Sequence, residues 1–251
     1  MNLGLNGKVA LVTGGARDVG GGIARALAAE GAVIAVNYRS SANDAESVVA
    51  AIKAQGGIAR AYAADVADYA AVEAMTGAIV SDFGRIDILV NNAGFAVRQR
   101  FQDTKPDDWR RHIDVGMYGP IHTSHAVLPY MMKQGSGRIL SVAGDSSRIG
   151  EAGLALAAAA RAGAIALMKS LAKEFGRFGI TANALSLGLV ETAHSDPAWM
   201  AENRERISKL YPLRRIGKAE DVAPMVVLLS SDAGSWITGQ VISVNGGFSM
   251  V

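Results

Sequence analysis

The chain has 251 residues, of which 50% are hydrophobic and 19% charged, with a formal net charge of +2 and no cysteine. So small a net charge argues against a nucleic-acid or membrane surface, and the lack of cysteine excludes disulfides, a thiolate nucleophile and a thiolate metal site. Segment 1–15 lacks the charged and apolar regions of a secretory signal, and no stretch approaches eighteen uninterrupted apolar residues. We expect a cytoplasmic protein with one domain, 1–251, and no bound metal.

Apolar, strand-like runs alternate with helical segments along the whole chain. Strands are predicted at 8–13, 32–38, 58–64, 86–91, 138–142, 180–185 and 241–244. Helices are predicted at about 20–30, 44–54, 70–83, 107–132, 154–175 and 219–229, with an irregular segment at 189–216. Strands that alternate with helices of this length are typical of parallel sheets. The sequence therefore predicts a single-domain α/β fold, a Rossmann-type doubly wound sheet of about seven strands with helices on both faces.

A glycine-rich turn lies between the first strand and the first helix. Segment 13–22 reads TGGARDVGGG, so backbone N–H groups and a helix N-terminus could meet a pyrophosphate there. The second strand ends without an Asp or Glu to accept ribose hydroxyls; Arg39 stands there instead, and Arg17 lies in the turn. Two guanidinium groups so placed favour the 2′-phosphate of NADP(H) over NAD(H), unless both are only solvated surface charges.

Several motifs together make the chain resemble the short-chain dehydrogenase/reductase family, close to the bacterial 3-oxoacyl-(acyl-carrier-protein) reductases and cyclic-alcohol dehydrogenases. Besides the glycine turn, they are Asp65-Val66, Asn91-Asn92-Ala93-Gly94, the run KSLAKE at 169–174, and ITGQ and VNGG within 237–247. The resemblance covers essentially the whole chain. It implies an NADP(H)-dependent oxidoreductase of carbonyls or secondary alcohols, with a small-molecule substrate, a homotetramer or homodimer, and a segment at 189–216 that covers the substrate.

The turn and the resemblance together assign residues to the cofactor. The expected cofactor-binding residues are Gly14, Arg17, Asp18, Val19, Gly20, Tyr38, Arg39, Ser40, Asp65, Val66, Asn92, Ala93, Gly94, Arg161 and Gly188. Two places depart from the family pattern: Asp18 stands where the turn has its second glycine, and Leu187-Gly188 replaces Pro-Gly. Asp18 either brings a carboxylate near the phosphates or caps the helix that follows.

The catalytic residues that the resemblance implies are all replaced. The family has a Tyr and, four residues later, a Lys on the long helix, with a Ser about thirteen residues before the Tyr and an Asn on the preceding helix. Aligned on the neighbouring motifs, the Asn, Ser, Tyr and Lys positions hold Gly116, Gly144, Ala157 and Arg161. Alanine and glycine transfer no proton, and arginine is a poor proton relay because its guanidinium group stays protonated in proteins. We expect ordinary carbonyl reduction to be severely impaired, with a hollow beside the nicotinamide site.

Other polar side chains are candidates for the missing roles. Asp145 and Ser146 directly follow Gly144 and are candidate catalytic residues with Arg161. Asp145 would form an ion pair with Arg161 if it pointed into the cleft, although residues of these types commonly hydrogen-bond within their own loop. Further candidate acids are Tyr118, Glu191 and His194.

Four interpretations stay open at this point. The chain is an oxidoreductase with a relocated proton donor, a non-redox enzyme on the same scaffold, a catalytically silent cofactor-binding protein or partner subunit, or an enzyme whose catalytic residues were replaced deliberately.

Overall fold

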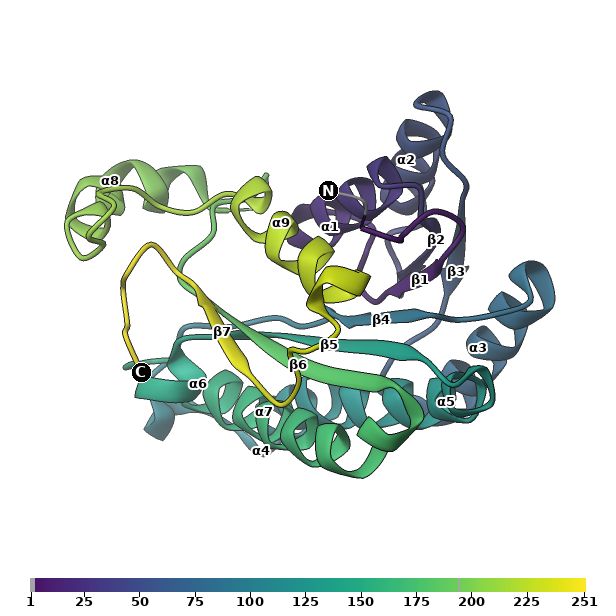
Figure 1. Cartoon of the computed structure of the whole chain (residues 1–251). Helices are drawn as coiled ribbons and strands as arrows, with labels where there is room; N and C mark the ends of the chain where they lie inside the picture. The colour runs from purple at the N-terminus through teal and green to yellow at the C-terminus, as the bar shows by residue number, and fades with distance from the viewer. Residues whose placement is uncertain (1–2, 194) are drawn as a thin grey trace.

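Parallel strands form one sheet in the computed structural model, which describes residues 3–193 and 195–251 (Figure 1). The seven strands of this part of the chain are β1 (Val9–Val12), β2 (Val33–Tyr38), β3 (Ala59–Ala63), β4 (Ile88–Asn91), β5 (Gly137–Gly144), β6 (Ile180–Leu187) and β7 (Val241–Val244). Their order in the sheet is β3-β2-β1-β4-β5-β6-β7, so the winding direction reverses between β1 and β4. The predicted fold class is confirmed.

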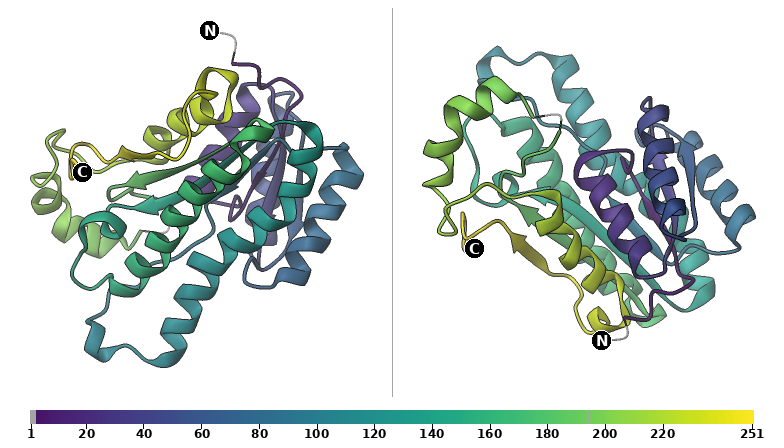
Figure 2. Two further views of the ribbon diagram at one scale, coloured as in Figure 1. Left: turned by 60° about the horizontal axis from the view of Figure 1, so that its bottom comes forward. Right: turned by 90° about the horizontal axis from the view of Figure 1, so that it is seen from above.

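Helices cover both faces of the sheet (Figures 1 and 2). One face carries α1 (Asp18–Ala29), α2 (Ala42–Ala54) and α9 (Ala219–Ser230). The other carries α3 (Tyr69–Phe83), α5 (Gly119–Gln134) and α7 (Ala155–Phe175). Because apolar helices bury both faces, β1, β4 and β6 are buried along their whole lengths. This explains why β1 and most of β4 read as continuous apolar runs rather than alternating ones, whereas β6 also buries the polar residues Thr181, Asn183 and Ser186.

The long helix α7 lies against β5 and β6 and forms one wall of the carboxyl edge of the sheet. With the turn that follows it, the segment Ala155–Phe178 is long and apolar enough to cross a membrane by length and composition alone, a test that core helices also pass. The register of the two strands beneath α7 sets the position of the site. β5 and β6 pair from Gly137 with Ile180 to Gly144 with Leu187, so both strands end together at that edge.

The helix predicted at 107–132 is continuous but changes its geometry in the middle. It consists of α4 (Pro106–Ile113), a π-helical turn at Asp114–Tyr118 and α5. Gly116 lies in the π-helical turn, where the ideal position of a Cβ atom is only 2.9 Å from the Cβ atom of Ala160 on α7. The widened turn is therefore packed directly on α7.

The segment at 189–216, predicted to be irregular, contains the helix α8 (Pro197–Ser208). Asp196 caps it, accepting hydrogen bonds from the backbone N–H groups of Ala198 and Trp199, and Pro197 occupies the first helical position. An Asp-Pro pair is a recognised helix start, so the sequence carried a signal that the prediction missed. The helix stands away from the sheet in both views of Figure 2, and Met200 and Ile207 pack in a small separate cluster with Tyr211.

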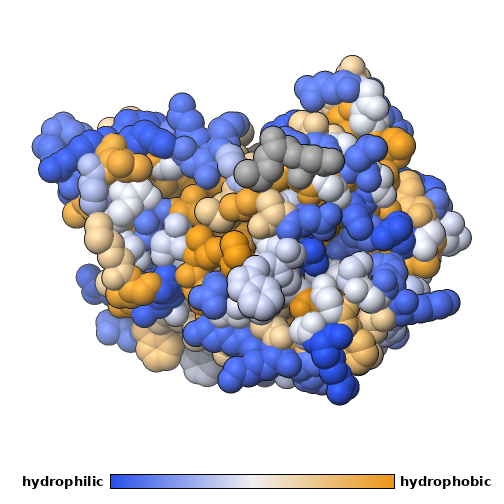
Figure 3. Space-filling model, viewed as in Figure 1, coloured by the Kyte–Doolittle hydropathy of each residue, from blue (hydrophilic) through white to orange (hydrophobic). Residues whose placement is uncertain are grey.

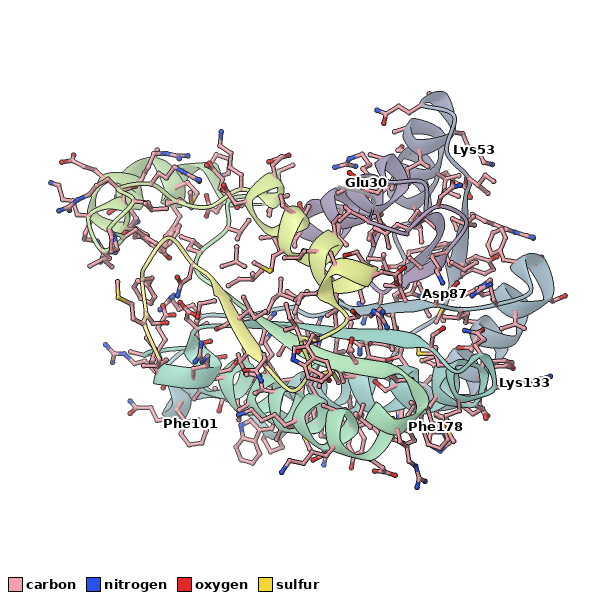
Figure 4. The ribbon with its side chains drawn as sticks, viewed as in Figure 1. Glu30, Lys53, Asp87, Phe101, Lys133 and Phe178 are labelled. Atoms are coloured by element: carbon pink, nitrogen blue, oxygen red, sulfur yellow. The ribbon has the colours of Figure 1, made fainter. Side chains whose placement is uncertain are left out.

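A buried carboxylate ties β1 to β4 at the end of the sheet remote from α8 (Figure 4). Asp87 is 4% exposed, and its Oδ2 accepts a hydrogen bond from the backbone N–H of Val9 at 2.9 Å. Arg85 donates to both carboxylate oxygens, at 2.7 and 2.5 Å. The charge of the buried carboxylate is thus balanced by Arg85, and its hydrogen bond to Val9 adds to the hydrogen-bonded pairing of β1 with β4.

Replacing Asp87 should destabilise the fold without touching the opposite edge of the sheet. We expect Asp87→Ala to lower the free energy of unfolding by about 2–4 kcal/mol, because the N–H of Val9 loses its buried acceptor. Asp87→Asn keeps an acceptor and should lose about half as much. Urea unfolding followed by circular dichroism measures both, and equal losses in the two variants would contradict this account.

Candidate functional site

A cleft of about 500 Å³ opens at the carboxyl ends of the central strands, where the winding of the sheet reverses. Ligands of doubly wound sheets bind at this place. All residues expected to bind the cofactor line this one cleft, namely Gly14, Arg17, Asp18, Val19, Gly20, Tyr38, Arg39, Ser40, Asp65, Val66, Asn92, Ala93, Gly94, Arg161 and Gly188. Asp145 and Ser146 are not among its lining residues. On the face of the molecule seen in Figure 3, apolar side chains gather at the centre and hydrophilic ones at the rim.

The glycine turn is held against the end of β4 by a small hydrogen-bond network. Asn92 donates from Nδ2 to the carbonyl oxygens of Thr13 and Gly14, at 3.0 and 3.1 Å. In return, the hydroxyl of Thr13 accepts from the N–H groups of Asn92 and Ala93, both at 3.0 Å. A Cβ atom on Gly20 would lie 2.3 Å from the carbonyl oxygen of Gly14, so only glycine allows α1 to start this close. The N-terminus of α1 therefore faces the cleft at short range.

Asn37 supports this turn from beneath, and the sequence analysis missed it. This buried side chain at the end of β2 accepts from the N–H of Gly14 at 3.2 Å and donates to the carbonyl oxygen of Ala64 at 3.0 Å. It thereby joins the carboxyl ends of three strands. The sequence contained a signal for this role, because Asn37 is the only amide residue in the apolar run VIAVNY. A buried amide needs hydrogen-bond partners for both its oxygen and its nitrogen.

Two arginines lie at the end of the cleft that holds the glycine turn, and both are loosely paired. Nη1 of Arg39 is 3.8 Å from Oδ2 of Asp65, and Nε of Arg17 is 3.9 Å from Oδ2 of Asp18. The side chains of both arginines are about half exposed. Exposed ion pairs at such distances contribute little, so either guanidinium group is free to turn toward an anion in the cleft.

Asp18 has an unusual backbone for a residue with a side chain. Its φ is 52°, in the left-handed region that favours glycine. The helix α1 begins at Asp18, with Arg17 as the residue before it. The side chain of Asp18 lines the cleft beside the N-terminus of α1.

The other end of the cleft, here named the reactive end, includes Gly144 and Arg161. Gly144 ends β5, and Ala157, one helical turn before Arg161 on α7, is buried and does not line the cleft. Nη2 of Arg161 is 3.1 Å from the ideal Cβ position of Gly94, and Nη1 is 3.6 Å from that of Gly144. The guanidinium group thus fills part of the predicted hollow, and Ala160 fills the part beside Gly116.

Arg161 is a cation without a partner in the part of the chain that the structure describes. No hydrogen bond or ion pair reaches its guanidinium group there, and burial alone lowers its pKa from the ordinary arginine value. The side chain stays protonated at any physiological pH, since an arginine does not deprotonate in proteins. It can therefore bind hydroxyl groups or anions, but it cannot relay protons.

Asp145 forms no ion pair with Arg161, and its partners lie outside its own loop. Asp145 is 3% exposed and turns away from the cleft, accepting from the hydroxyl of Ser186 at 2.6 Å and from Nδ2 of Asn245 at 2.7 Å. Ser186 lies on β6 and Asn245 directly follows β7, so the carboxylate has buried hydrogen-bond donors from two neighbouring strand ends. Ser146 is buried beside it in the short helix α6 (Ser146–Ile149). Neither residue is placed to act on a ligand in the cleft.

Tyr118 and Glu191, two of the further candidate acids, do not line the cleft either. Tyr118 is 49% exposed and stacks on the ring of His122, with 5.8 Å between the ring centroids. Glu191 is hydrogen-bonded to Arg204, which lowers the pKa of that carboxyl group. His194 lies outside the described residues.

The structure adds Phe95 and Arg111 to the lining of the cleft. The guanidinium carbon of Arg111 lies 4.5 Å from the centroid of the Phe95 ring, on which the ring of His112 also packs. The sequence could have predicted that Phe95 lines the cleft, because Phe95 directly follows the Asn92-Ala93-Gly94 motif. It could not have predicted this for Arg111, because only tertiary packing brings α4 over the end of β4.

The chain is similar to known proteins over nearly its whole length. A family model described as "Enoyl-(Acyl carrier protein) reductase" matches residues 14–249. The 3-oxoacyl-[acyl-carrier-protein] reductase of Staphylococcus aureus is 41% identical over 243 residues, 97% of this chain and 98% of the relative. A solved structure of gluconate 5-dehydrogenase from Burkholderia cenocepacia, in complex with NADP and tartrate, has a TM-score of 0.90 at 31% identity, covering 98% of this chain and 97% of that one. A mutant short-chain dehydrogenase/reductase from Serratia marcescens has a TM-score of 0.91 at 35% identity, covering 98% and 99% of the two chains.

Asp18 offers a direct test of the cleft as a pyrophosphate site. We expect Asp18→Asn to tighten the binding of NADPH about three- to tenfold, because a like charge beside the phosphates is removed while the left-handed backbone stays accessible to Asn. Asp18→Gly should do the same, and fluorescence titration measures both. Asp44, in the first turn of α2 and outside the cleft, is the matched control. Equal shifts in Asp44→Asn would contradict the assignment.

Proposed function

The chain belongs to the short-chain dehydrogenase/reductase family, and we propose that it binds NADP(H) in the cleft but carries out the family's ordinary carbonyl reduction poorly. The observation that carries the proposal is the contrast between the two halves of one cleft. The half around the glycine turn has glycines, two arginines and a helix N-terminus that a dinucleotide would use. At the other half, positions 144 and 161 in the lining and positions 116 and 157 behind it hold no hydroxyl or amine.

The residues present fit a dinucleotide. The close start of α1 at Gly20 directs backbone N–H groups and the positive helix end toward a pyrophosphate. Arg39 and Arg17 line the cleft and would hold a 2′-phosphate, and Asp65 and Val66, also in the lining, would contact the adenine. Arg161 reaches the strand ends near Gly94 and Gly144 and would donate to the nicotinamide ribose. When bound, the nicotinamide would supply or accept a hydride.

Proton transfer is the step that this chain cannot perform in the family's way. Reduction of a carbonyl needs an acid beside the substrate oxygen, and the methyl group of Ala157 holds no proton to give. A positioned acid commonly contributes about 10²–10⁴ in rate. Arg161 is present but stays protonated, so it orients groups rather than passing protons.

A catalytically silent, cofactor-binding role is the alternative, and the packing of Gly116 favours it. The methyl group of Ala160 stands so close that an Asn side chain at position 116 would require α7 to shift. The packing has therefore adapted to the replaced residue. A non-redox reaction on the same scaffold is consistent with the same packing.

Restoring the missing groups tests the proposal. A Cβ atom at Gly144 would meet only ordinary contacts of 3.5–3.8 Å, so a serine fits there. We expect the triple variant Gly144→Ser, Ala157→Tyr, Arg161→Lys to reduce a 3-oxoacyl thioester with NADPH at least about 100-fold faster than the unmodified chain. Gly116 is left unchanged because of Ala160.

The control for this experiment is the double variant Gly144→Ser, Arg161→Lys, which lacks the phenol and should stay slow. Circular dichroism and NADPH titration of each variant verify folding and cofactor binding. Turnover by the unmodified chain at the rate of the restored triple variant would contradict the proposal.

Cofactor preference depends on Arg39. We expect Arg39→Ala to weaken NADPH binding about tenfold and to leave NADH binding within about twofold, because a charge-assisted hydrogen bond to the 2′-phosphate is lost. Arg60→Ala is the matched control, since Arg60 is exposed on β3 and pairs with Asp82 outside the cleft. Fluorescence titration with both cofactors decides the matter. An equal effect on NADPH and NADH would show that Arg39 does not contact the phosphate.

A further inference from the structure

The charges that line the cleft are unevenly distributed. Arg17 and Arg39 each have a carboxylate within 3.9 Å, from Asp18 and Asp65. The other two arginines of the lining, Arg111 and Arg161, have no carboxylate partner among the described residues. The uncompensated positive charge is therefore concentrated at the reactive end, and a cleft of one charge sign attracts ligands of the opposite sign.

Arg161 differs in this respect from Arg138, the other arginine withdrawn from solvent. Burial lowers the pKa of Arg138 as well, but its guanidinium group donates to backbone carbonyls of Gly137, Gly179 and Ser231 and pairs with Asp232. The five N–H donors of Arg161 have no such acceptors in the described chain. Two ribose hydroxyls of a bound cofactor would use some of these donors, but they are neutral and would leave the charge uncompensated.

The position of the guanidinium fork defines what can reach it. Its two terminal nitrogens lie 3.1 Å and 3.6 Å from the ideal Cβ positions of Gly94 and Gly144, across the ends of β4 and β5. Gly144 places no side chain between the fork and the end of β5. A planar fork of parallel N–H groups matches the two oxygens of a carboxylate better than it matches a single carbonyl oxygen.

Another part of the lining combines a cation with apolar surface. Arg111 lies over the ring of Phe95, which directly follows Gly94. Val115, Val142 and Val190 also line the cleft. Small ligands of mixed character, with an anionic group and a short apolar body, fit such a lining.

We propose that the reactive end of the cleft binds the carboxylate of a small organic acid, held by the guanidinium fork of Arg161 with Arg111 as a second cation. The proposal rests on the proposed function, because it places the acid beside a bound NADP(H). It assigns the substrate class as free acids rather than neutral ketones. Arg161 is then a residue for substrate specificity, in the place where the family has a lysine.

The test compares an acid with its neutral ester. Acetoacetate and methyl acetoacetate are titrated into the unmodified chain saturated with NADPH, and binding is followed by calorimetry. We expect acetoacetate to bind at least about tenfold more tightly, since a charge-assisted bidentate contact is available only to the acid. Equal binding of acid and ester would overturn the proposal.

Variants localise the contact. Arg161→Met should abolish the preference for the acid and Arg161→Lys should keep a reduced one, because lysine retains the charge but not the fork. Arg98→Ala is the matched control, since Arg98 is exposed, pairs with Glu151 and lies outside the cleft. An unchanged preference in Arg161→Met would overturn the assignment. As a second measurement, acetoacetate should raise the Tm of the unmodified chain but not that of Arg161→Met.

The two proposals fail in different ways. Failure of NADPH to bind, with acetoacetate still preferred over its ester by the chain alone, would reject the proposed cofactor and keep the acid site. Tight binding of NADPH with no preference for the acid would keep the proposed cofactor and reject the acid site.

Discussion

The close approach of the glycine turn to the end of β4 is the contact on which the cleft depends. Gly20 lies so near the carbonyl oxygen of Gly14 and the amide of Asn92 that no side chain fits between them. This proximity lets Asn92 and Thr13 exchange hydrogen bonds across the two central strands. The N-terminus of α1, the end of β1 and the start of the loop after β4 are thereby held together.

The two ends of the cleft follow different physical rules. Around the turn, polar groups are satisfied by one another: Asn37 joins three strand ends, and each acid has a nearby arginine. At the reactive end the catalytic positions are small or cationic, and the carboxylate nearest in sequence, Asp145, is satisfied beneath the sheet. A cation without an internal partner is left facing the cleft. Such an arrangement favours binding of an anion over proton transfer.

The replaced positions have been absorbed by packing rather than left as voids. Ala160 approaches Gly116 in the π-helical turn, and Gly163 on the same helix allows the side chain of Met117 to lie against α7. Small residues on α7 therefore set the distance to the widened turn, since close-packed interiors tolerate few cavities. An asparagine at position 116 would therefore push against Ala160 and change the packing of the π-helical turn on α7.

The sequence by itself determined the order and type of the elements and the half of the cleft that holds the glycine turn. Both depend on residues that are close together in the sequence. Hydrophobic periodicity is a property of one segment, and a motif such as TGGARDVG acts through the backbone conformation of its own turn. Through the resemblance to a family, it also predicts that the catalytic positions are replaced. Tertiary structure alone decided that Asp145 points to Ser186 and Asn245, that Arg161 has no partner, and that Arg111 lies over Phe95. Each of these depends on which distant strand end or helix packs beside the residue, and spacing along the chain contains no such information.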